Sequence, residues 1–225
     1  MYRLTDALKQ ELLRQPESGM GFQVVEITTD TNHHLRGIVY NAELVLPDGY
    51  DQRTLLREYR AERMKVGGYG QEIREIRLMA RNAASGWATY SAHESRGAYG
   101  AQPFTGPAKD APKRKTTPAE MFRRFSAFAN DRRVTPDLRL LPGTYATTHA
   151  DSLLVHTGKE AVARYALPNP DPAVHRFSII TLAATTIQCG IVEPANGQPG
   201  GGVEVLFAEG TQMGSVWHKD EIPPG

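Results

Sequence analysis

A glycine-rich stretch that leads into a strand-like segment contains the carboxylate best placed for chemistry. Residues 197–202 are Gly-Gln-Pro-Gly-Gly-Gly, and residues 203–207 are Val-Glu-Val-Leu-Phe. Glycines let a backbone approach a ligand closely, and strand alternation places Glu204 on the face opposite Val203 and Val205. The loop lacks the Lys-Ser/Thr of a Walker loop and the glycine spacing of a dinucleotide fingerprint. Taken alone, Glu204 is either a ligand-facing carboxylate or an ordinary exposed strand residue.

The surroundings of Glu204 favour the first interpretation. The segment that it begins resembles the last motif of ADP-ribosyltransferases, in which a glutamate-bearing strand continues into a Gly-Thr turn, here residues 210–211. The glycines before it resemble the same region of tuberculosis necrotizing toxin-type NAD⁺ glycohydrolases, although that family has glutamine where this chain has Glu204. Three upstream pieces follow the toxin family's order: Leu-Arg-Leu-Leu-Pro-Gly-Thr-Tyr at 138–145, Ala-Arg-Tyr-Ala-Leu-Pro at 163–168 and His-Arg-Phe at 175–177. The resemblance covers about residues 137–225.

This resemblance implies an enzyme that binds NAD⁺ and cleaves its nicotinamide–ribose bond. Such cleavage passes through an oxocarbenium-like state, whose positive charge Glu204 would stabilise, while His175 would contact the ribose or a phosphate. Arginine suits the pyrophosphate because its planar fork binds two oxygens at once, and a tyrosine ring can stack on nicotinamide. The residues expected to bind NAD⁺ are two arginines, with the first preferred, two tyrosines and the loop: Arg139, Arg164, Tyr145, Tyr165, Gln198, Gly200 and Gly201.

The resemblance leaves the acceptor of the ADP-ribose open. Transferases use glutamate at the position of Glu204 and pass ADP-ribose to a protein or a nucleic acid, whereas the glycohydrolases pass it to water. For a toxin or effector of this kind, an immunity or antitoxin protein is a further expected partner. An alternative is a non-catalytic RNA- or protein-binding module that uses residues 109–139, which hold nine basic and four acidic residues. A third hypothesis is a structural or immunity-type protein that keeps the fold without activity.

Other residue patterns point to no chemistry. The single cysteine, Cys189, allows no intrachain disulfide and no thiolate metal site, and we expect it to be a buried small hydrophobe. Adjacent His33 and His34 lack further ligands nearby and fit a turn better than a metal site. The site residues therefore include no metal ligand.

The elements expected to position the site form an α+β fold. Residues 1–82 are predicted to form a small accessory unit, with a helix from Thr5 to Arg14, a strand at 22–27, one long or two short strands at 35–46, and a short helix or strand around 73–78. Residues 83–116, rich in Gly, Ala, Ser, Pro and Lys, predict a flexible linker or long loop.

Residues 117–225 are predicted to form a β-rich, split-sheet domain similar to ADP-ribosyltransferases. Thr117-Pro-Ala-Glu favours a helix start, with Met121, Phe125 and Phe128 on one helical face. Short strands are expected at 138–141, 143–147, 152–156, 174–180, 186–192 and 203–207. Since every expected NAD⁺ contact follows residue 137, the N-terminal unit is predicted to be dispensable for NAD⁺ binding.

Composition limits the cellular setting. The hydrophobic fraction of 40% supports a packed core, and no apolar run reaches the roughly 18 residues that a membrane helix needs. The first predicted helix carries Asp6, Lys9 and Glu11, so it is not a signal peptide. We therefore expect no membrane partner, and a protein that is cytoplasmic or delivered by a dedicated secretion system.

Overall fold

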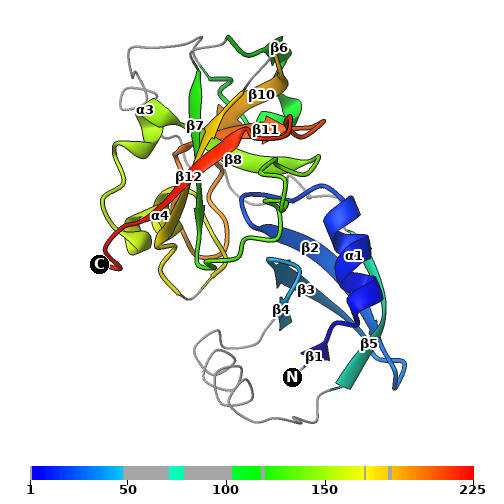
Figure 1. Ribbon diagram of the computed structural model, residues 1–225. Helices are drawn as coiled ribbons and strands as arrows, with labels where there is room; N and C mark the ends of the chain where they lie inside the picture. Colours follow the sequence, from blue (N-terminus) through cyan, green and yellow to red (C-terminus); the bar gives the residue numbers. More distant parts are fainter. Residues whose placement is uncertain (1, 48–70, 79–102, 118–119, 170, 182–183) are drawn as a thin grey trace.

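The chain folds as two β-sheets with few helices. The computed structural model describes residues 2–47, 71–78, 103–117, 120–169, 171–181 and 184–225. One sheet has five strands and the other has seven, and all strand pairs are antiparallel apart from β1 with β5 (Figure 1). This mixed, mostly β architecture with a helix near the N-terminus is compatible with the expected α+β class. No helix in the described part of the chain is long and apolar enough to span a membrane.

The N-terminal sheet packs against one helix, α1 (Asp6–Arg14). The Thr5 hydroxyl caps this helix by accepting the backbone N–H of Leu8, and Leu12 packs with Val25 and Val39 of the sheet. The strands, in spatial order, are β1 (Tyr2–Arg3), β5 (Gln71–Leu78), β2 (Phe22–Thr29), β3 (His34–Tyr40) and β4 (Leu44–Pro47). The helix and the strands predicted here are confirmed, and the element around 73–78 is a strand.

The C-terminal sheet has seven strands and carries its short helices in the connections. In spatial order the strands are β12 (Val216–Glu221), β9 (His175–Ile180), β7 (Met121–Ser126), β8 (Thr144–Thr148), β11 (Val203–Phe207), β10 (Thr186–Ile191) and β6 (Lys113–Lys115). The helices are η1 (Ala108–Asp110), α3 (His149–Ser152) and α4 (Gly158–Arg164). The strands predicted at 143–147, 174–180, 186–192 and 203–207 correspond to β8, β9, β10 and β11.

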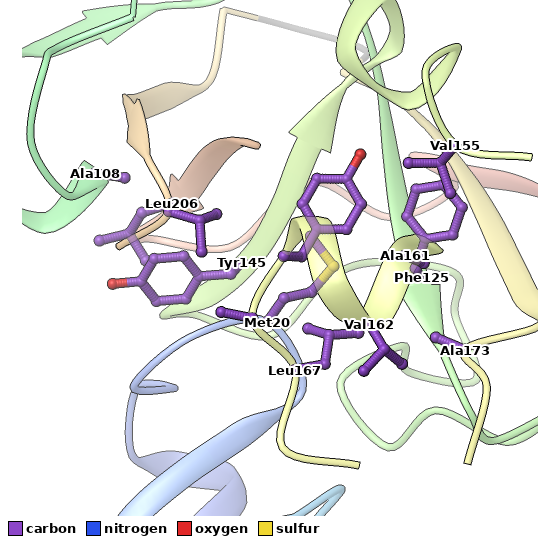
Figure 2. Close-up of a cluster of buried hydrophobic side chains, with 13 residues drawn as sticks. Met20, Ala108, Phe125, Tyr145, Val155, Ala161, Val162, Leu167, Ala173 and Leu206 are labelled. Atoms are coloured by element: carbon purple, nitrogen blue, oxygen red, sulfur yellow. The ribbon is translucent and has the colours of Figure 1, made fainter. Parts of the chain in front are cut away.

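This sheet separates two hydrophobic clusters. One face carries Phe122, Ile179 and Val205. The other carries Phe125 and Leu206, and here the sheet packs against α4 and the chain that follows it (Figure 2). Glu204 lies in β11 on the second face, because it is two residues from Leu206.

The helix predicted from Thr117 is wrong, since the chain there forms β7. Its backbone pairs with β9 along its whole length and with β8 at Phe122 and Arg123. Phe122 and Phe125 consequently point to opposite faces and enter different clusters. A short apolar run fits helical and strand periods alike, so sheet pairing decided the outcome.

Four further elements differ from the sequence-based expectation. The strand predicted at 152–156 is the end of α3 and a turn, and residues 138–141 make only an isolated bridge, between Val134 and Leu140. The capping box of Thr157 and Glu160 starts the short helix α4, which was not predicted, and β12 was not predicted either.

The end of the predicted linker belongs to the C-terminal sheet. Residues 83–102 lie outside the described residues, but β6 pairs with β10, with Arg114 opposite Ile187. Upstream, Phe104 donates its backbone N–H to the Cys189 carbonyl at 2.9 Å. The C-terminal sheet is thus completed by residues before position 117.

A buried ion network joins the two sheets. Both terminal nitrogens of Arg124 donate to the Glu17 carboxylate, at 2.9 and 3.0 Å, and its Nε donates to Asp131 at 2.9 Å. The three side chains are between 1 and 3% exposed. Burial alone would lower the pKa of Arg124, but the charges of Asp131 and Glu17 outweigh it and raise the pKa. Met20 also enters the cluster around Tyr145 (Figure 2), so the N-terminal unit is packed into the C-terminal one.

Candidate functional site

Glu204 is a buried carboxylate in the middle of the C-terminal sheet. It lies opposite Gly190 of β10, and only 2% of it is exposed. Its Oε1 accepts the backbone N–H of Ala108 at 2.8 Å. A charge-assisted hydrogen bond of this kind holds the carboxylate and the backbone of η1 together.

Gly190 explains how the chain can pass over Glu204. An added Cβ at position 190 would lie 2.3 Å from the Gly106 carbonyl and 2.5 Å from the Ala108 nitrogen. Only glycine leaves room for this backbone, and Gln188 of the same strand donates to the carbonyls of Lys109 and Ala111. The segment from Gly106 to Ala111, called the covering segment below, therefore lies on Glu204 and is tied to β10.

A second polar group lies beside Glu204 on the same sheet face. The pairing of Ala146 with Val205 places Thr147 of β8 next to Glu204 in the row across the strands. Thr147 donates to Asp151 of α3 at 3.4 Å, a long hydrogen bond. Asp151 thus connects the strand face that carries Glu204 to the helices above it.

Asp151 is the centre of that polar group. Arg164 binds it through two nitrogens, Nε at 3.0 Å and Nη2 at 2.6 Å, and the Tyr165 hydroxyl donates to it at 3.1 Å. Asp151 is 4% exposed and Tyr165 2%. Burial, followed by the negative charge of Asp151, raises the pKa of Tyr165 well above 10.0, so Tyr165 is a neutral hydrogen-bond donor at neutral pH.

The glycine-rich loop packs against the end of α4. Gly200 donates its N–H to the Ala163 carbonyl at 3.0 Å, and Gly202 donates to the Arg164 carbonyl at 3.0 Å. A Cβ on Gly202 would lie 2.8 Å from the Tyr165 ring. Gly201 binds the Val192 carbonyl at 2.9 Å. These glycines permit close approach to protein backbone, whereas the sequence alone predicted close approach to a ligand.

Gln198 and Tyr145 are two further residues predicted for the site. Gln198 forms an isolated antiparallel bridge with Ala195 in the turn before the glycines. Tyr145 of β8, labelled in Figure 2, is 3% exposed and belongs to the same hydrophobic cluster as Tyr165. Its backbone N–H donates to Glu17 and its carbonyl accepts from Arg124, which fixes the strand beside Glu204.

Two of the residues predicted for the site lie elsewhere. Arg139 precedes β8, is 52% exposed on its side chain, and pairs with Asp137 at 3.1 Å. Arg139 lies near the C-terminal end of β11, because the backbone N–H of its neighbour Leu140 donates to the Thr211 hydroxyl. Glu204 lies instead near the start of β11. His175 begins β9, which β7 and β8 separate from β11, and its Nδ1 is 3.1 Å from Glu221.

Sequence reasoning missed two polar residues of the site, Thr147 and Asp151. The available signal was the Thr148-x-x-Asp151 spacing of a helix N-cap, which the structure uses: Thr148 accepts the Asp151 N–H. The described residues contain no group of three or more His, Cys, Asp or Glu side chains arranged to hold a metal ion. The chemistry that this arrangement offers is therefore that of carboxylates, tyrosine hydroxyls and guanidinium groups.

The basic segment 109–139 does not form a continuous cationic strip. Arg124 and Arg133 point inward, with side chains 1% and 4% exposed. Arg114 pairs with Glu120 at 2.9 Å, and Arg132 lies 3.8 Å from Glu43. Five of the nine basic side chains of this segment therefore lie near a carboxylate, whereas Lys109, Lys113 and Lys115 are exposed.

Comparisons with known proteins identify no relative: no protein-family model, no curated protein and no solved structure matches this chain.

Proposed function

We propose that this protein consumes NAD⁺, and that Glu204 is the carboxylate that assists cleavage of the nicotinamide–ribose bond. The observation that carries the proposal is the position of Glu204 beside Thr147 on one face of the C-terminal sheet, where Thr147 hydrogen-bonds Asp151, the residue that also binds Arg164 and Tyr165. These residues come from separate segments, and the motif order of the ADP-ribosyltransferase-like pattern selected all but Thr147 and Asp151. The proposal draws no support from Arg139 or His175, which lie apart from this group.

The reaction needs a negative charge beside the ribose. When the bond between the nicotinamide nitrogen and C1′ breaks, nicotinamide leaves with the electron pair and positive charge develops on the ribose. The Glu204 carboxylate stabilises that charge, and water or an acceptor group then bonds to C1′ and gives up one proton. Because the carboxylate acts mainly in the transition state, its loss affects turnover more than binding.

Substrate access to Glu204 requires the covering segment to move. The carboxylate is 2% exposed and holds the Ala108 N–H, so a ribose hydroxyl has to replace that N–H as the hydrogen-bond donor. In the form described here, Glu204 anchors the covering segment. We propose that binding of NAD⁺ displaces residues 106–111 and releases Glu204 for catalysis.

The first experiment incubates the full-length protein with NAD⁺ and quantifies free nicotinamide and ADP-ribose by chromatography. Labelled NAD⁺ with a cell lysate in a parallel reaction reveals transfer to a protein or a nucleic acid. Release of nicotinamide in equal amount to ADP-ribose indicates hydrolysis, and labelled macromolecules indicate transfer. If neither reaction releases nicotinamide above the uncatalysed rate, the proposed function is wrong.

The variant Glu204→Gln then separates the two activities. Glutamine keeps an oxygen for the Ala108 N–H, so the fold is preserved, but the charge is lost. In a transferase, we expect turnover to fall on the order of 10²-fold, as is typical when one electrostatic group is removed. In a glycohydrolase of the toxin type, activity survives, because glutamine is that family's own residue. Glu209→Gln is the matched control, since Glu209 is an exposed carboxylate just after the same strand.

The RNA-binding alternative receives less support. Two of its nine basic residues, Arg124 and Arg133, are buried in the network with Glu17, and others are paired with acidic neighbours. Binding to nucleic acid requires accessible cations along a surface. The protein-acceptor and nucleic-acid-acceptor forms of the transferase hypothesis remain outcomes of the labelling experiment.

A further inference from the structure

A group of charged side chains lies on the same sheet face as Glu204 but beyond β8. It consists of Arg123 from β7, Arg176 from β9, His218 and Asp220 from β12, and His149 from α3, and is called the basic cluster here. Cross-strand pairing puts Arg123 opposite Ser178, Ser178 opposite His218, and Arg176 opposite Asp220. Paired residues share a face, so the strand members of the cluster point to the same side of the sheet.

The members of the cluster are close enough to influence one another electrostatically. Burial, followed by the positive charges of Arg123 and Arg176, lowers the pKa of His149. The pKa of Arg123 is also lowered, by burial and then by Arg176. Like charges destabilise each other, and the carboxylate of Asp220 offsets part of this repulsion by attracting both Arg176 and Arg123.

Two of these side chains carry a buried polar atom with no hydrogen-bond partner in the described part of the protein. They are Nη1 of Arg123 and Nδ1 of His149. Such atoms are rare because losing water without a replacement partner is costly. Two unsatisfied nitrogens in one cluster indicate that something outside the described chain supplies the acceptor.

The ion pairs of the basic cluster also favour an additional anion beside Arg123. Asp220 holds Arg176 through two contacts, Nε to Oδ1 at 3.1 Å and Nη2 to Oδ2. Among the described residues, Arg123 has no carboxylate within 4 Å. By contrast, two other unsatisfied buried nitrogens lie near a carboxylate: Arg133 Nε at 3.7 Å from Glu17 and His175 Nδ1 at 3.1 Å from Glu221. Arg123 therefore has no direct ion-pair partner among the described residues, although Asp220 attracts it at longer range.

We infer that Arg123, His149 and Arg176 bind an oxyanion of the phosphate class. A phosphate group presents several acceptor oxygens in a tetrahedral arrangement, so it can accept from the guanidinium fork of Arg123 and from the ring N–H of His149 at once. His218 lies exposed at the rim of the cluster. The inference rests on charge and unsatisfied donors alone, and it does not depend on the proposed function.

Two sources can supply this phosphate group. The row across the sheet runs from Glu204 through Thr147 to Arg123, which is two strand spacings of about 4.8 Å each. The phosphates of a nucleotide that reaches toward Glu204 are one source, and free inorganic phosphate or pyrophosphate is the other. The experiment distinguishes them by using both kinds of ligand.

The test is isothermal titration calorimetry of the full-length protein with inorganic pyrophosphate and, separately, with ADP-ribose. The wild type is compared with Arg123→Gln, Arg176→Gln and the control Arg36→Gln, which removes the same charge from an exposed position in the N-terminal sheet. We expect pyrophosphate to bind the wild type and the control, and each cluster variant to bind at least tenfold more weakly. If Arg123→Gln does not fold, Arg176→Gln and His149→Gln carry the comparison.

The outcomes are distinct. Cluster-dependent binding of ADP-ribose that pyrophosphate displaces identifies a nucleotide as the source, and cluster-dependent binding of pyrophosphate alone identifies free phosphate. Absence of any binding by the wild type, or equal affinity of all folded variants, overturns the inference. Failure here leaves the nicotinamide-release experiment unaffected, because that experiment reports on Glu204.

Discussion

The buried contact between Glu17 and Arg124 gives the sharpest test of how the two units depend on each other. Glu17→Gln removes the negative charge but keeps the length and shape of the side chain. Arg124 then retains only Asp131 as a counter-charge, and the amide nitrogen of the new side chain faces the guanidinium or the N–H groups of Gly21 and Tyr145. The change thus leaves a buried positive charge partly uncompensated.

The magnitude follows from the burial. Removing one partner of a buried ion pair costs about 3–5 kcal/mol, and Glu17 and Arg124 are 3% and 1% exposed, so solvent offers little screening. Domains of this size unfold with about 5–15 kcal/mol. The loss corresponds to a fall of roughly 6–20 °C in Tm, from about 2–4 °C per kcal/mol.

Urea unfolding, followed by circular dichroism and by tryptophan fluorescence, measures this loss. The control is Glu11→Gln, which removes the same charge from a half-exposed carboxylate that pairs with Arg14 on the surface of α1. This control should change the free energy of unfolding by no more than about 0.5 kcal/mol. If Glu17→Gln is as stable as Glu11→Gln, the network does not hold the two units together, and a C-terminal fragment starting near Pro103, which keeps the covering segment, should fold on its own.

Three other predictions concern single features. Burial raises the pKa of Cys189 to about 11 from 9.0, which lowers the fraction of thiolate at pH 8. The rate of alkylation by iodoacetamide should therefore be roughly 100-fold lower in the folded protein than in the urea-unfolded chain. Equal rates would show that the thiol is accessible. Gly190→Ala should lower the free energy of unfolding by about 1–3 kcal/mol, because the added Cβ collides with the covering segment. In the control Gly197→Ala, the added Cβ meets nothing within 4 Å but the backbone has φ +71°, so the free energy of unfolding should fall by only about 1 kcal/mol. Burial raises the pKa values of Tyr40 and Tyr165 above 10.0. Above about pH 10 the folded state therefore keeps protons that the unfolded state has lost, and the free energy of unfolding should fall as the pH rises. Ultraviolet titration should show these two phenols ionising only with unfolding, and ionisation of all tyrosines in the folded protein would contradict this.

Local patterns were sufficient to predict much of the strand framework. Alternation in Phe22–Ile27 and Val203–Phe207 gave the correct element type, and the cap at Thr5 gave the start of α1. They were insufficient at Thr117, where a helix-start signal precedes a strand. That signal is local, whereas pairing of β7 with β8 and β9 involves residues more than 20 positions away, and the longer-range interaction prevailed.

The position of Glu204 was predicted only in part. Its strand and its face, away from Val203 and Val205, follow from alternation, but its burial depends on a backbone segment almost a hundred residues earlier. The isolated glycine at position 190 was a usable signal, because a glycine inside a strand often marks close approach of another backbone. Arg139 and His175 could not be placed correctly because chain order does not determine the spatial order of strands: β9 adjoins β7 and β12, and two strands separate it from β11.

The Glu17–Arg124 contact also bears on how the protein forms during synthesis. Glu17 leaves the ribosome 107 residues before Arg124, and Tyr145, which donates its N–H to the same carboxylate, follows 128 residues after Glu17. Until those residues emerge, the segment of Glu17 and Met20 has no place to bury its charge or its apolar side chain. The early chain can build the sheet of β2 and β3 from neighbouring segments, but completing the molecule requires closing a large loop, which slows folding. A chaperone that shields the segment around Glu17 and Met20 during this interval would raise the yield of folded protein without changing its final stability.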